Sequence, residues 1–186
     1  MLLPPHPRPR PLLLLLLLCA SLTTAAQMDS LPRFPQDFVG DWAGTLEVFN
    51  PEGRQMTVPM ELLIQPVNDT LYTYTIVYGD RETGTRGYYI HPGPEGPHHW
   101  VCDERNGILL DGYYLGGVYA STFTVMGNYL ISTIELREEE LLYTIVSGRE
   151  DPVRTSGGKV VDGEEIPPVN AYSVRGLQRS ALRRSR

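Results

Sequence analysis

The chain has 186 residues, of which 41% are hydrophobic and 20% charged, and its 22 acidic and 16 basic side chains leave a net charge of −6. This acidic balance argues against nucleic acid as a partner, because phosphate binding needs a basic face. The two cysteines exclude a dense disulfide framework, so the fold must rest on an apolar core.

The first 26 residues follow the order of a secretory signal peptide. Arg8 and Arg10 precede an unbroken leucine run over 12–18, and small residues continue up to Ala26. The leucine run is too short to span a bilayer, which needs roughly 20 apolar residues, so we predict no transmembrane segment. We expect cleavage after Ala26 and export to the periplasm or the cell exterior. The mature chain then keeps one cysteine, Cys102, which has no internal partner for a disulfide.

Cys19 offers a second interpretation of the same segment, as the acylated residue of a lipoprotein. That signal needs a small residue directly before the cysteine, and Leu18 stands there. We therefore expect export without a lipid anchor. No feature of the sequence indicates an oligomeric state.

Beyond a short lead-in, apolar and polar residues alternate along most of the chain. The alternation predicts nine strands, at 42–48, 56–64, 72–78, 85–91, 98–103, 108–115, 118–126, 129–137 and 141–147. Turn sequences such as Asn50-Pro51-Glu52-Gly53 and Gly116-Gly117 separate them. Strands linked in this way form an antiparallel meander, which removes its exposed edges by closing. We therefore predict an all-β fold, an up-and-down barrel over residues 27–149. The alternative is an immunoglobulin-like sandwich.

The C-terminal part contains two further predicted regions. Residues 150–168 are rich in Gly, Glu and Pro and are expected to form a linker or a long loop. Residues 169–186 alternate weakly at first, and then Leu177, Ala181 and Leu182 follow at helix-like spacing. Two alternatives stay open for this region: a closing strand or short helix with a basic end, and a disordered end.

Gly40-Asp41-Trp42 resembles the Gly-x-Trp motif that opens the first strand of lipocalins and other calycin barrels. The resemblance implies a short 3₁₀ turn before this strand and a tryptophan that closes the barrel floor against an arginine from a late strand. Gly40, Trp42 and Arg137 are then the expected floor residues, with Arg149 as the alternative arginine. The further lipocalin motifs are not legible, so the match covers the first strand and the general architecture.

Tyrosines are frequent in the predicted strands. Tyr72, Tyr74, Tyr78 and Tyr114 are expected to line an interior cavity, because small-ligand sites combine apolar walls with a few polar groups. The plainer interpretation is that tyrosine simply fits a pleated surface. The expected partner is a small apolar or amphipathic molecule, and we predict no cofactor.

A metal site is a weaker hypothesis for the segment around residue 100. His98 and Cys102 share one face of a strand, and His91 would bring the set to three ligands, the minimum for a catalytic zinc site. Exposed histidines and a buried, inert cysteine are the plainer interpretation. A haem held by one histidine, as in nitrobindin-like barrels, is a further alternative.

Asp111 is the weak candidate for a catalytic residue. It follows Leu109 and Leu110, and a carboxylate in apolar surroundings is costly unless it is paired. Near tyrosines it could act as a general acid or base. Near the Asn106-Gly107 turn it could instead accept hydrogen bonds from backbone amides.

We therefore expect an exported, lipocalin-like barrel that binds a small molecule in its interior. Residues 78–80 and 103–111 are also similar to segments of uncharacterised secreted barrel proteins of Gram-negative bacteria, a likeness that implies no activity. One alternative is an enzyme that uses Asp111, a tyrosine and His91 in the same cavity. The other is a solid structural barrel filled by large interior residues, Trp42, Met56, Met60, Tyr74, Phe123 and Met126.

Overall fold

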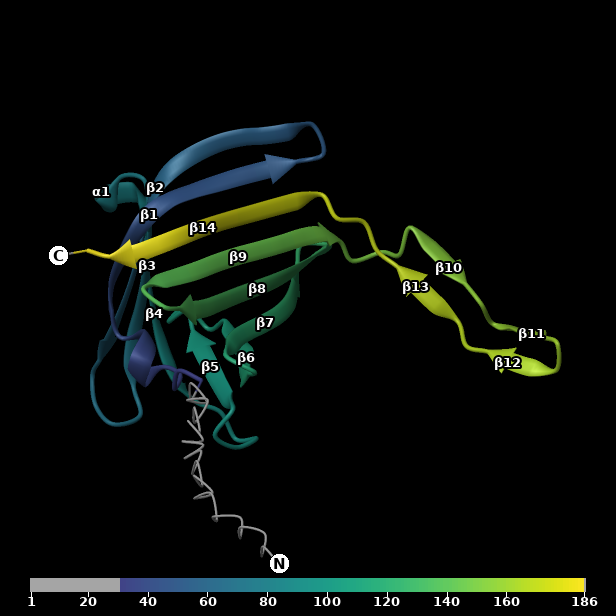
Figure 1. Cartoon of the computed structure of the whole chain (residues 1–186), viewed down its shortest axis with the longest axis horizontal. Coiled ribbons are helices and arrows are strands. Elements are labelled where there is room, and N and C mark those ends of the chain that lie inside the picture. Colours follow the sequence, from purple (N-terminus) through teal and green to yellow (C-terminus); the bar gives the residue numbers. More distant parts are fainter. Residues whose placement is uncertain (1–30, 186) are drawn as a thin grey trace, which may run out of the picture. The chain divides into compact units, whose positions relative to one another are not determined.

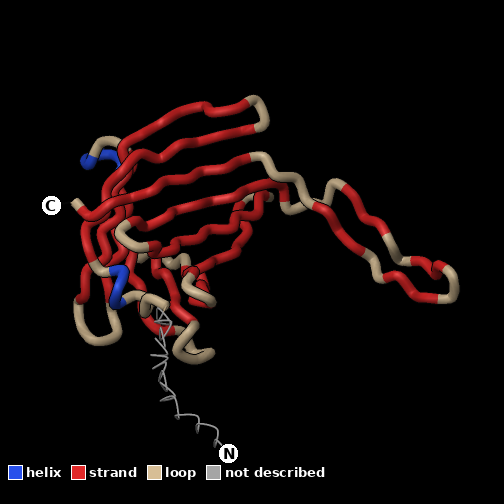
Figure 2. The backbone as a smooth tube through the Cα atoms, in the orientation of Figure 1, coloured by secondary structure: helices blue, strands red, loops and turns tan. Residues whose placement is uncertain are grey.

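The computed structural model describes residues 31–185, and the expected signal peptide, together with Cys19, lies outside the described residues. Within residues 31–185, ten strands form a closed antiparallel barrel from which a narrow β-ribbon projects (Figures 1 and 2). In this part of the chain no helix has the length and apolar character needed to cross a membrane. The prediction of an all-β antiparallel barrel is confirmed.

The barrel strands are β1 (Gly40–Asn50), β2 (Gly53–Pro66), β3 (Tyr72–Tyr78), β4 (Thr85–Pro92), β5 (His99–Asp103), β6 (Leu109–Leu115), β7 (Val118–Val125), β8 (Asn128–Arg137), β9 (Glu140–Arg149) and β14 (Gly176–Arg184). The ribbon contains β10 (Arg154–Ser156), β11 (Lys159–Val161), β12 (Glu164–Ile166) and β13 (Val169–Ala171). The two helical turns are η1 (Gln36–Phe38) and α1 (Arg81–Gly84).

Each strand from β1 to β9 pairs with the next, and β14 closes the barrel between β9 and β1. Nine of these strands match the predicted ones, and β14 is the tenth. The alternation places every second side chain inside: on β2, Met60, Leu62 and Ile64 are at most 1% exposed. Gly116 and Gly117 make the β6–β7 turn with φ of +60° and +92°, values that favour glycine and suit a tight hairpin.

The segment before β1 closes one end of the barrel. Phe34 stacks on Tyr119 with ring centroids 4.3 Å apart and also contacts Tyr114, Trp100 and Phe38. Aromatic pairs of this kind contribute beyond their buried area. This end of the barrel is therefore a packed aromatic floor, and the opposite end carries the connections β1–β2, β3–β4, β5–β6, β7–β8 and β9–β14.

The floor contains the expected tryptophan, but a different arginine covers it. The guanidinium Cζ of Arg184, on β14, lies 4.3 Å from the centroid of the Trp42 ring. Arg184 also donates to the carbonyls of Val39 at 2.7 Å and Asp37 at 3.3 Å. A Cβ at Gly40 would overlap this guanidinium, which explains why glycine precedes the tryptophan by two residues.

The expected floor partner Arg137 must be corrected to Arg184. Arg137 lies exposed on β8 and pairs with Glu135 on the same strand, at 2.7 Å between Nε and Oε1. The alternative, Arg149, lies beside the β7–β8 turn at the opposite end of the barrel. The turn between β8 and β9 lies at the floor end of the barrel, but only β14 places an arginine over the indole of Trp42.

Residues 150–168, expected as a linker or loop, carry ordered strands instead. β10 pairs with β13 and β11 pairs with β12, so that the chain between β9 and β14 forms a ribbon of two short two-stranded sheets. Its strand residues are exposed apart from Ile166, which is partly buried. These strands pair only with one another, which explains why their sequences show at most a weak apolar alternation.

We expect the ribbon to be dispensable for folding. Replacing residues 154–171 by Asn-Gly should change the free energy of unfolding by less than about 0.5 kcal/mol, because the lost strands are exposed and pair only with one another. Urea unfolding of the shortened and full proteins measures this. A loss of more than about 1 kcal/mol would show that the ribbon supports barrel closure.

Candidate functional site

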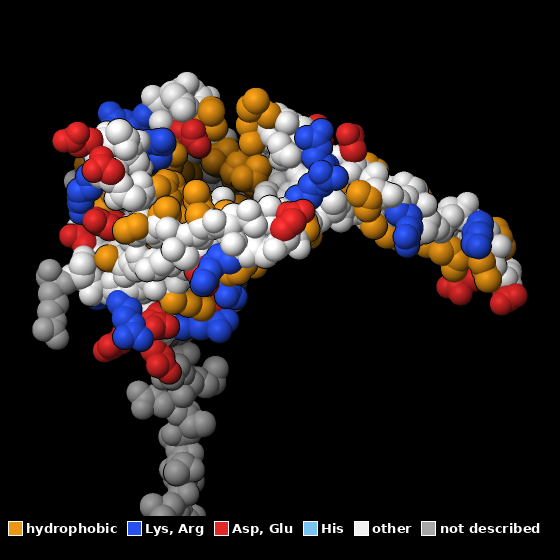
Figure 3. Space-filling view, turned by 90° about the horizontal axis from the view of Figure 1, so that it is seen from above, with side chains coloured by type: hydrophobic (Ala, Val, Ile, Leu, Met, Phe, Trp, Pro, Cys, Tyr) orange, Lys and Arg blue, Asp and Glu red, His pale blue; other side chains and the backbone are white. Residues whose placement is uncertain are grey.

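The candidate site is a cavity of about 150 Å³ inside the barrel, above the aromatic floor. Figure 3 shows a hollow in this part of the molecule with hydrophobic side chains inside it. Its lining comes from seven neighbouring strands and one turn: Tyr74, Ile76, Tyr78, Tyr88, Ile90, Cys102, Glu104, Leu110, Tyr119, Ser121, Phe123, Ser132, Tyr143 and Ile145.

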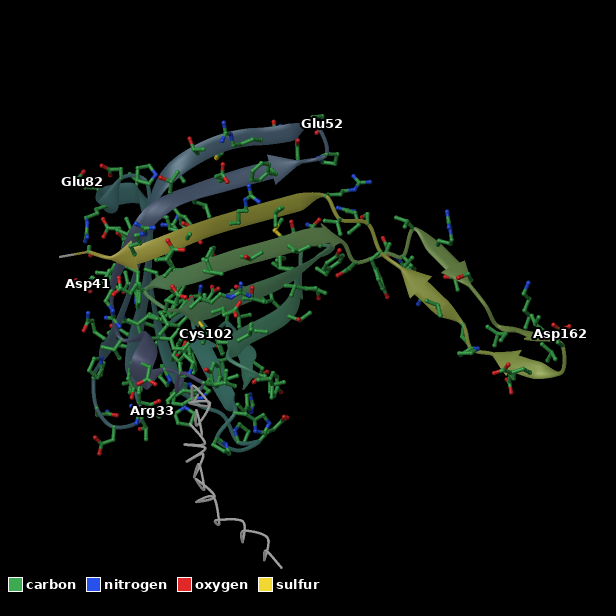
Figure 4. All side chains as sticks on the ribbon, viewed as in Figure 1. Arg33, Asp41, Glu52, Glu82, Cys102 and Asp162 are labelled. Atoms are coloured by element: carbon green, nitrogen blue, oxygen red, sulfur yellow. The ribbon has the colours of Figure 1, made fainter. Side chains whose placement is uncertain are left out.

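Strand register brings these side chains to similar depths. Ile90 pairs with Cys102, and Cys102 pairs with Leu110 on the next strand. On the far wall, Ser132 on β8 pairs with both Ser121 and Ile145. Because paired residues of a sheet point to the same face, the register forms a ring of inward side chains. Figure 4 places Cys102 inside the barrel accordingly.

Two tyrosines on opposite walls share one hydrogen bond across the cavity. The hydroxyls of Tyr78, at the end of β3, and Tyr143, on β9, are 2.9 Å apart. Burial raises the pKa of both phenols, most strongly that of Tyr143, and the pKa of Tyr74 is also raised well above its usual value by burial. These groups are therefore neutral at physiological pH and act as hydrogen-bonding groups without charge.

Cys102 is a neutral thiol. Burial, with smaller contributions from the carboxylates of Glu104 and Asp103, raises its pKa to about 12. A thiol with this pKa holds its proton at neutral pH and is a poor nucleophile and a poor metal ligand. Cys102 thus contributes to the cavity as a small, soft, apolar side chain.

Tyr119 is the polar group of the lining whose surroundings are least usual. It is 7% exposed, and its hydroxyl is the one buried side-chain polar atom in residues 31–185 that has no hydrogen-bond partner. The phenol end lies over Gly112, where a Cβ would overlap both the ring and the hydroxyl. Burial raises the pKa of this phenol far above its usual range.

The structure divides the four predicted cavity tyrosines into two pairs. Tyr74 and Tyr78 line the cavity, whereas Tyr72 and Tyr114 lie in the floor. Tyr72 packs edge-on against Trp100, and the Tyr114 hydroxyl donates to the carbonyl of Pro32. The sequence analysis did not select Tyr88, Tyr119 or Tyr143, although the same alternation puts all three on the inner face.

Asp111 does not lie in the cavity. Its side chain is 62% exposed on the outer face of β6, where Oδ1 lies 2.8 Å from Nε2 of the buried His99. The expected burial of this carboxylate among leucines is therefore wrong, because Leu110 faces inward and Asp111 faces outward. The ring of His99 also stacks on Tyr113 at 4.8 Å.

The three candidate metal ligands are also separated. Cys102 lines the cavity, His91 Nδ1 lies 3.1 Å from the carbonyl of Pro92, and His98 lies 6.1 Å from the outer-face ring of Tyr113. Residues 31–185 contain no cluster of three His, Cys, Asp or Glu side chains suited to a metal ion. No histidine is among the cavity residues, so the haem alternative lacks its ligand there.

A wider depression on the outer wall, along β1 and β14, is a less suitable site. It is open to solvent, and its charged side chains already form ion pairs. Glu47 lies 2.9 Å from Arg54 and 3.1 Å from Arg179. Such exposed pairs are typical of a solvated barrel surface.

No protein-family model and no curated protein matches this sequence. Among solved structures, the chain is similar to an S-type phycobiliprotein lyase, CPES, from Guillardia theta, with a TM-score of 0.51 and 8% identity over 80% of this chain and 88% of that one. It is also similar to Rv2717c from M. tuberculosis, with a TM-score of 0.47 and 16% identity over 80% and 92% of the two chains. The barrel is lipocalin-like, and at these identities the likeness concerns the fold alone.

Proposed function

We propose that this lipocalin-like barrel binds a small, largely apolar molecule in the cavity above its aromatic floor. The observation that carries the proposal is the cavity itself, whose wall combines five aliphatic or aromatic hydrocarbon side chains with tyrosine hydroxyls. Mostly apolar walls with a few placed polar groups are the usual composition of small-ligand sites.

The cavity volume limits the size of the ligand. A volume of about 150 Å³ suffices for a benzene-sized molecule. We therefore expect one aromatic ring or a short branched chain inside the barrel, with any further part of the ligand at the mouth. A ligand of this size reaches dissociation constants between about 1 μM and 1 mM.

The two alternatives have less support. The enzyme hypothesis relied on Asp111 and His91, and neither is a cavity residue. The solid barrel hypothesis relied in part on Met56 and Met126, which are 54% and 92% exposed instead of filling the interior. A cavity of about 150 Å³ remains in the barrel although Trp42, Met60 and Tyr74 are buried there.

We also propose that binding takes place after export, in the periplasm or outside the cell. This rests on the basic, leucine-rich and small-residue order of residues 1–26. A chain recovered from its native compartment should begin at Gln27.

A single substitution that fills the cavity tests the proposed function. Ser132→Phe adds a ring at the cavity wall, whereas Ile131→Phe, one residue away on the outer face, is the matched control. We expect toluene, titrated by calorimetry, to bind the native protein and the control alike and to bind Ser132→Phe at least about tenfold more weakly. Equal binding by all three proteins would place the ligand elsewhere, and no binding by the native protein would refute the proposal.

A further inference from the structure

We propose that the ligand of this cavity is an apolar amine, whose hydrocarbon part lies among the tyrosines and whose ammonium group pairs with the carboxylate of Glu104 at the mouth. The inference rests on the proposed function and names the chemical class of its ligand. It is carried by the charge of the cavity wall and by the aromatic rings that form it.

Glu104 is the one charged side chain of the cavity lining, which contains no Lys, Arg or His. It follows the inward-facing Cys102 by two residues, so strand alternation turns both side chains to the same face. Its backbone N–H donates to the carbonyl of Ile108 at 3.0 Å and closes the β5–β6 turn, which lies at the open end of the barrel. The lining is therefore negatively charged near its mouth and neutral below it.

No cation of the described chain neutralises this carboxylate. The ion pairs within residues 31–185 do not include Glu104, whose Oε2 accepts from the Asn106 amide at 3.2 Å. The neighbouring Arg105 lies over a tyrosine ring on the outer face of β4, 4.8 Å from its centroid. Arg86 lies near the same end of the barrel, but its guanidinium donates to two backbone carbonyls. A cation that arrives with the ligand would find Glu104 without a charged partner.

The negative charge of Glu104 reaches the interior of the cavity. Burial raises the pKa of the Tyr88 phenol and of the Cys102 thiol, and in both cases the Glu104 carboxylate is the next largest cause. The charge that disfavours a second anion at these positions attracts a cation there. An ammonium group near Glu104 can therefore carry a hydrocarbon part that extends into the cavity.

Aromatic rings add to this preference. Tyr78, Tyr88 and Phe123 are half-buried members of the lining, and Tyr78 is the last residue of β3, at the open end of the barrel. The face of an aromatic ring attracts a cation, and a neutral phenol oxygen can accept a hydrogen bond from an ammonium group. A carboxylate ligand would instead meet Glu104 as a like charge.

Four ligands with one benzene ring separate charge from hydrogen bonding and from apolar contact. Benzylamine is a cation at neutral pH, benzyl alcohol is its neutral counterpart of the same size, toluene has neither group and benzoate is an anion. Calorimetric titration of the native protein should show benzylamine binding about tenfold more tightly than benzyl alcohol, and benzoate not binding measurably.

Glu104→Gln is the decisive variant, because it removes the charge and keeps the size of the side chain and an acceptor for Asn106. It should bind benzyl alcohol as the native protein does and lose the preference for benzylamine. Glu139→Gln is the control: it makes the same change in net charge at the exposed β8–β9 turn, at the floor end, and should keep the preference. Glu104→Lys should reverse the order and bind benzoate more tightly than benzylamine.

The outcomes distinguish this inference from the proposed function. Equal binding of benzylamine and benzyl alcohol, tighter binding of benzoate by the native protein, or an amine preference that survives Glu104→Gln would overturn the assignment of an amine while leaving a ligand-binding barrel in place. Failure of toluene, benzyl alcohol and benzylamine alike to bind the native protein would overturn both.

Discussion

Replacing Trp42 by alanine is expected to lower the free energy of unfolding by about 3–5 kcal/mol, in line with the loss of a large buried aromatic side chain. Trp42 is 1% exposed and donates from Nε1 to the carbonyl of Phe38 at 2.9 Å. Its removal leaves a cavity in the floor and strips the stacking surface from Arg184. Urea unfolding followed by the fluorescence of Trp100 measures the change.

Two arginine variants test the assignment of the floor partner. Arg184→Ala should cost about 1–2 kcal/mol, because it removes both a cation–π contact and hydrogen bonds to backbone carbonyls. Arg137→Ala should stay within about 0.5 kcal/mol of the native protein, since it removes an exposed pair. The reverse order of effects would contradict the corrected partner.

Alkaline unfolding is the second large effect. Burial raises the pKa values of Cys102, Tyr74, Tyr119 and Tyr143 in the folded protein, whereas in the unfolded chain a thiol ionises near about 8.5 and a phenol near about 10. Above these values the folded state binds more protons than the unfolded state, so stability falls as pH rises.

The size of this effect follows from the number of groups. Each proton difference costs about 1.4 kcal/mol per pH unit, so four groups together approach about 5 kcal/mol per pH unit above pH 10. Over about two pH units this loss exceeds the free energy of unfolding of a typical domain. We expect cooperative unfolding between roughly pH 10 and 12, with tyrosinate absorbance rising in the same transition. Constant stability over this range, or ionisation of Tyr74, Tyr119 and Tyr143 while the protein stays folded, would contradict the buried, neutral assignment.

The sequence predicted the nine meander strands because their inner faces are strongly apolar. On β2 and β3 the alternation is nearly complete, from Met60, Leu62 and Ile64 to Tyr74 and Ile76. For β14 it left a closing strand as one of two open alternatives, because the inward residues Gln178 and Ser180 are polar. Ser180 is buried and donates to the carbonyl of Thr45 at 2.9 Å. The period-two signal is therefore weak in the strand that closes the barrel.

The sequence predicted which face of the sheet forms the site, but not how deep in the barrel each side chain lies. Alternation puts Tyr72, Tyr74, Tyr78 and Tyr114 on the inner face, yet Tyr114 packs on Phe34 and Tyr72 on Trp100 in the floor, so that only Tyr74 and Tyr78 reach the cavity. The contact between Arg184 and Trp42 could not be predicted from a local sequence pattern either, because the two residues lie at opposite ends of the barrel sequence. Asp111 was misplaced because Leu110, next to it on β6, faces inward, whereas Leu109, which shares the outer face with Asp111, is exposed.

Native mass spectrometry of the mature protein, purified from its own compartment, tests the central claim most directly. The account predicts a chain beginning at Gln27 with a reproducible added mass that is lost on denaturation, and it predicts that Ser132→Phe lacks this mass while Ile131→Phe keeps it. A bare native protein that also fails to take up toluene or benzylamine would contradict a ligand-binding cavity.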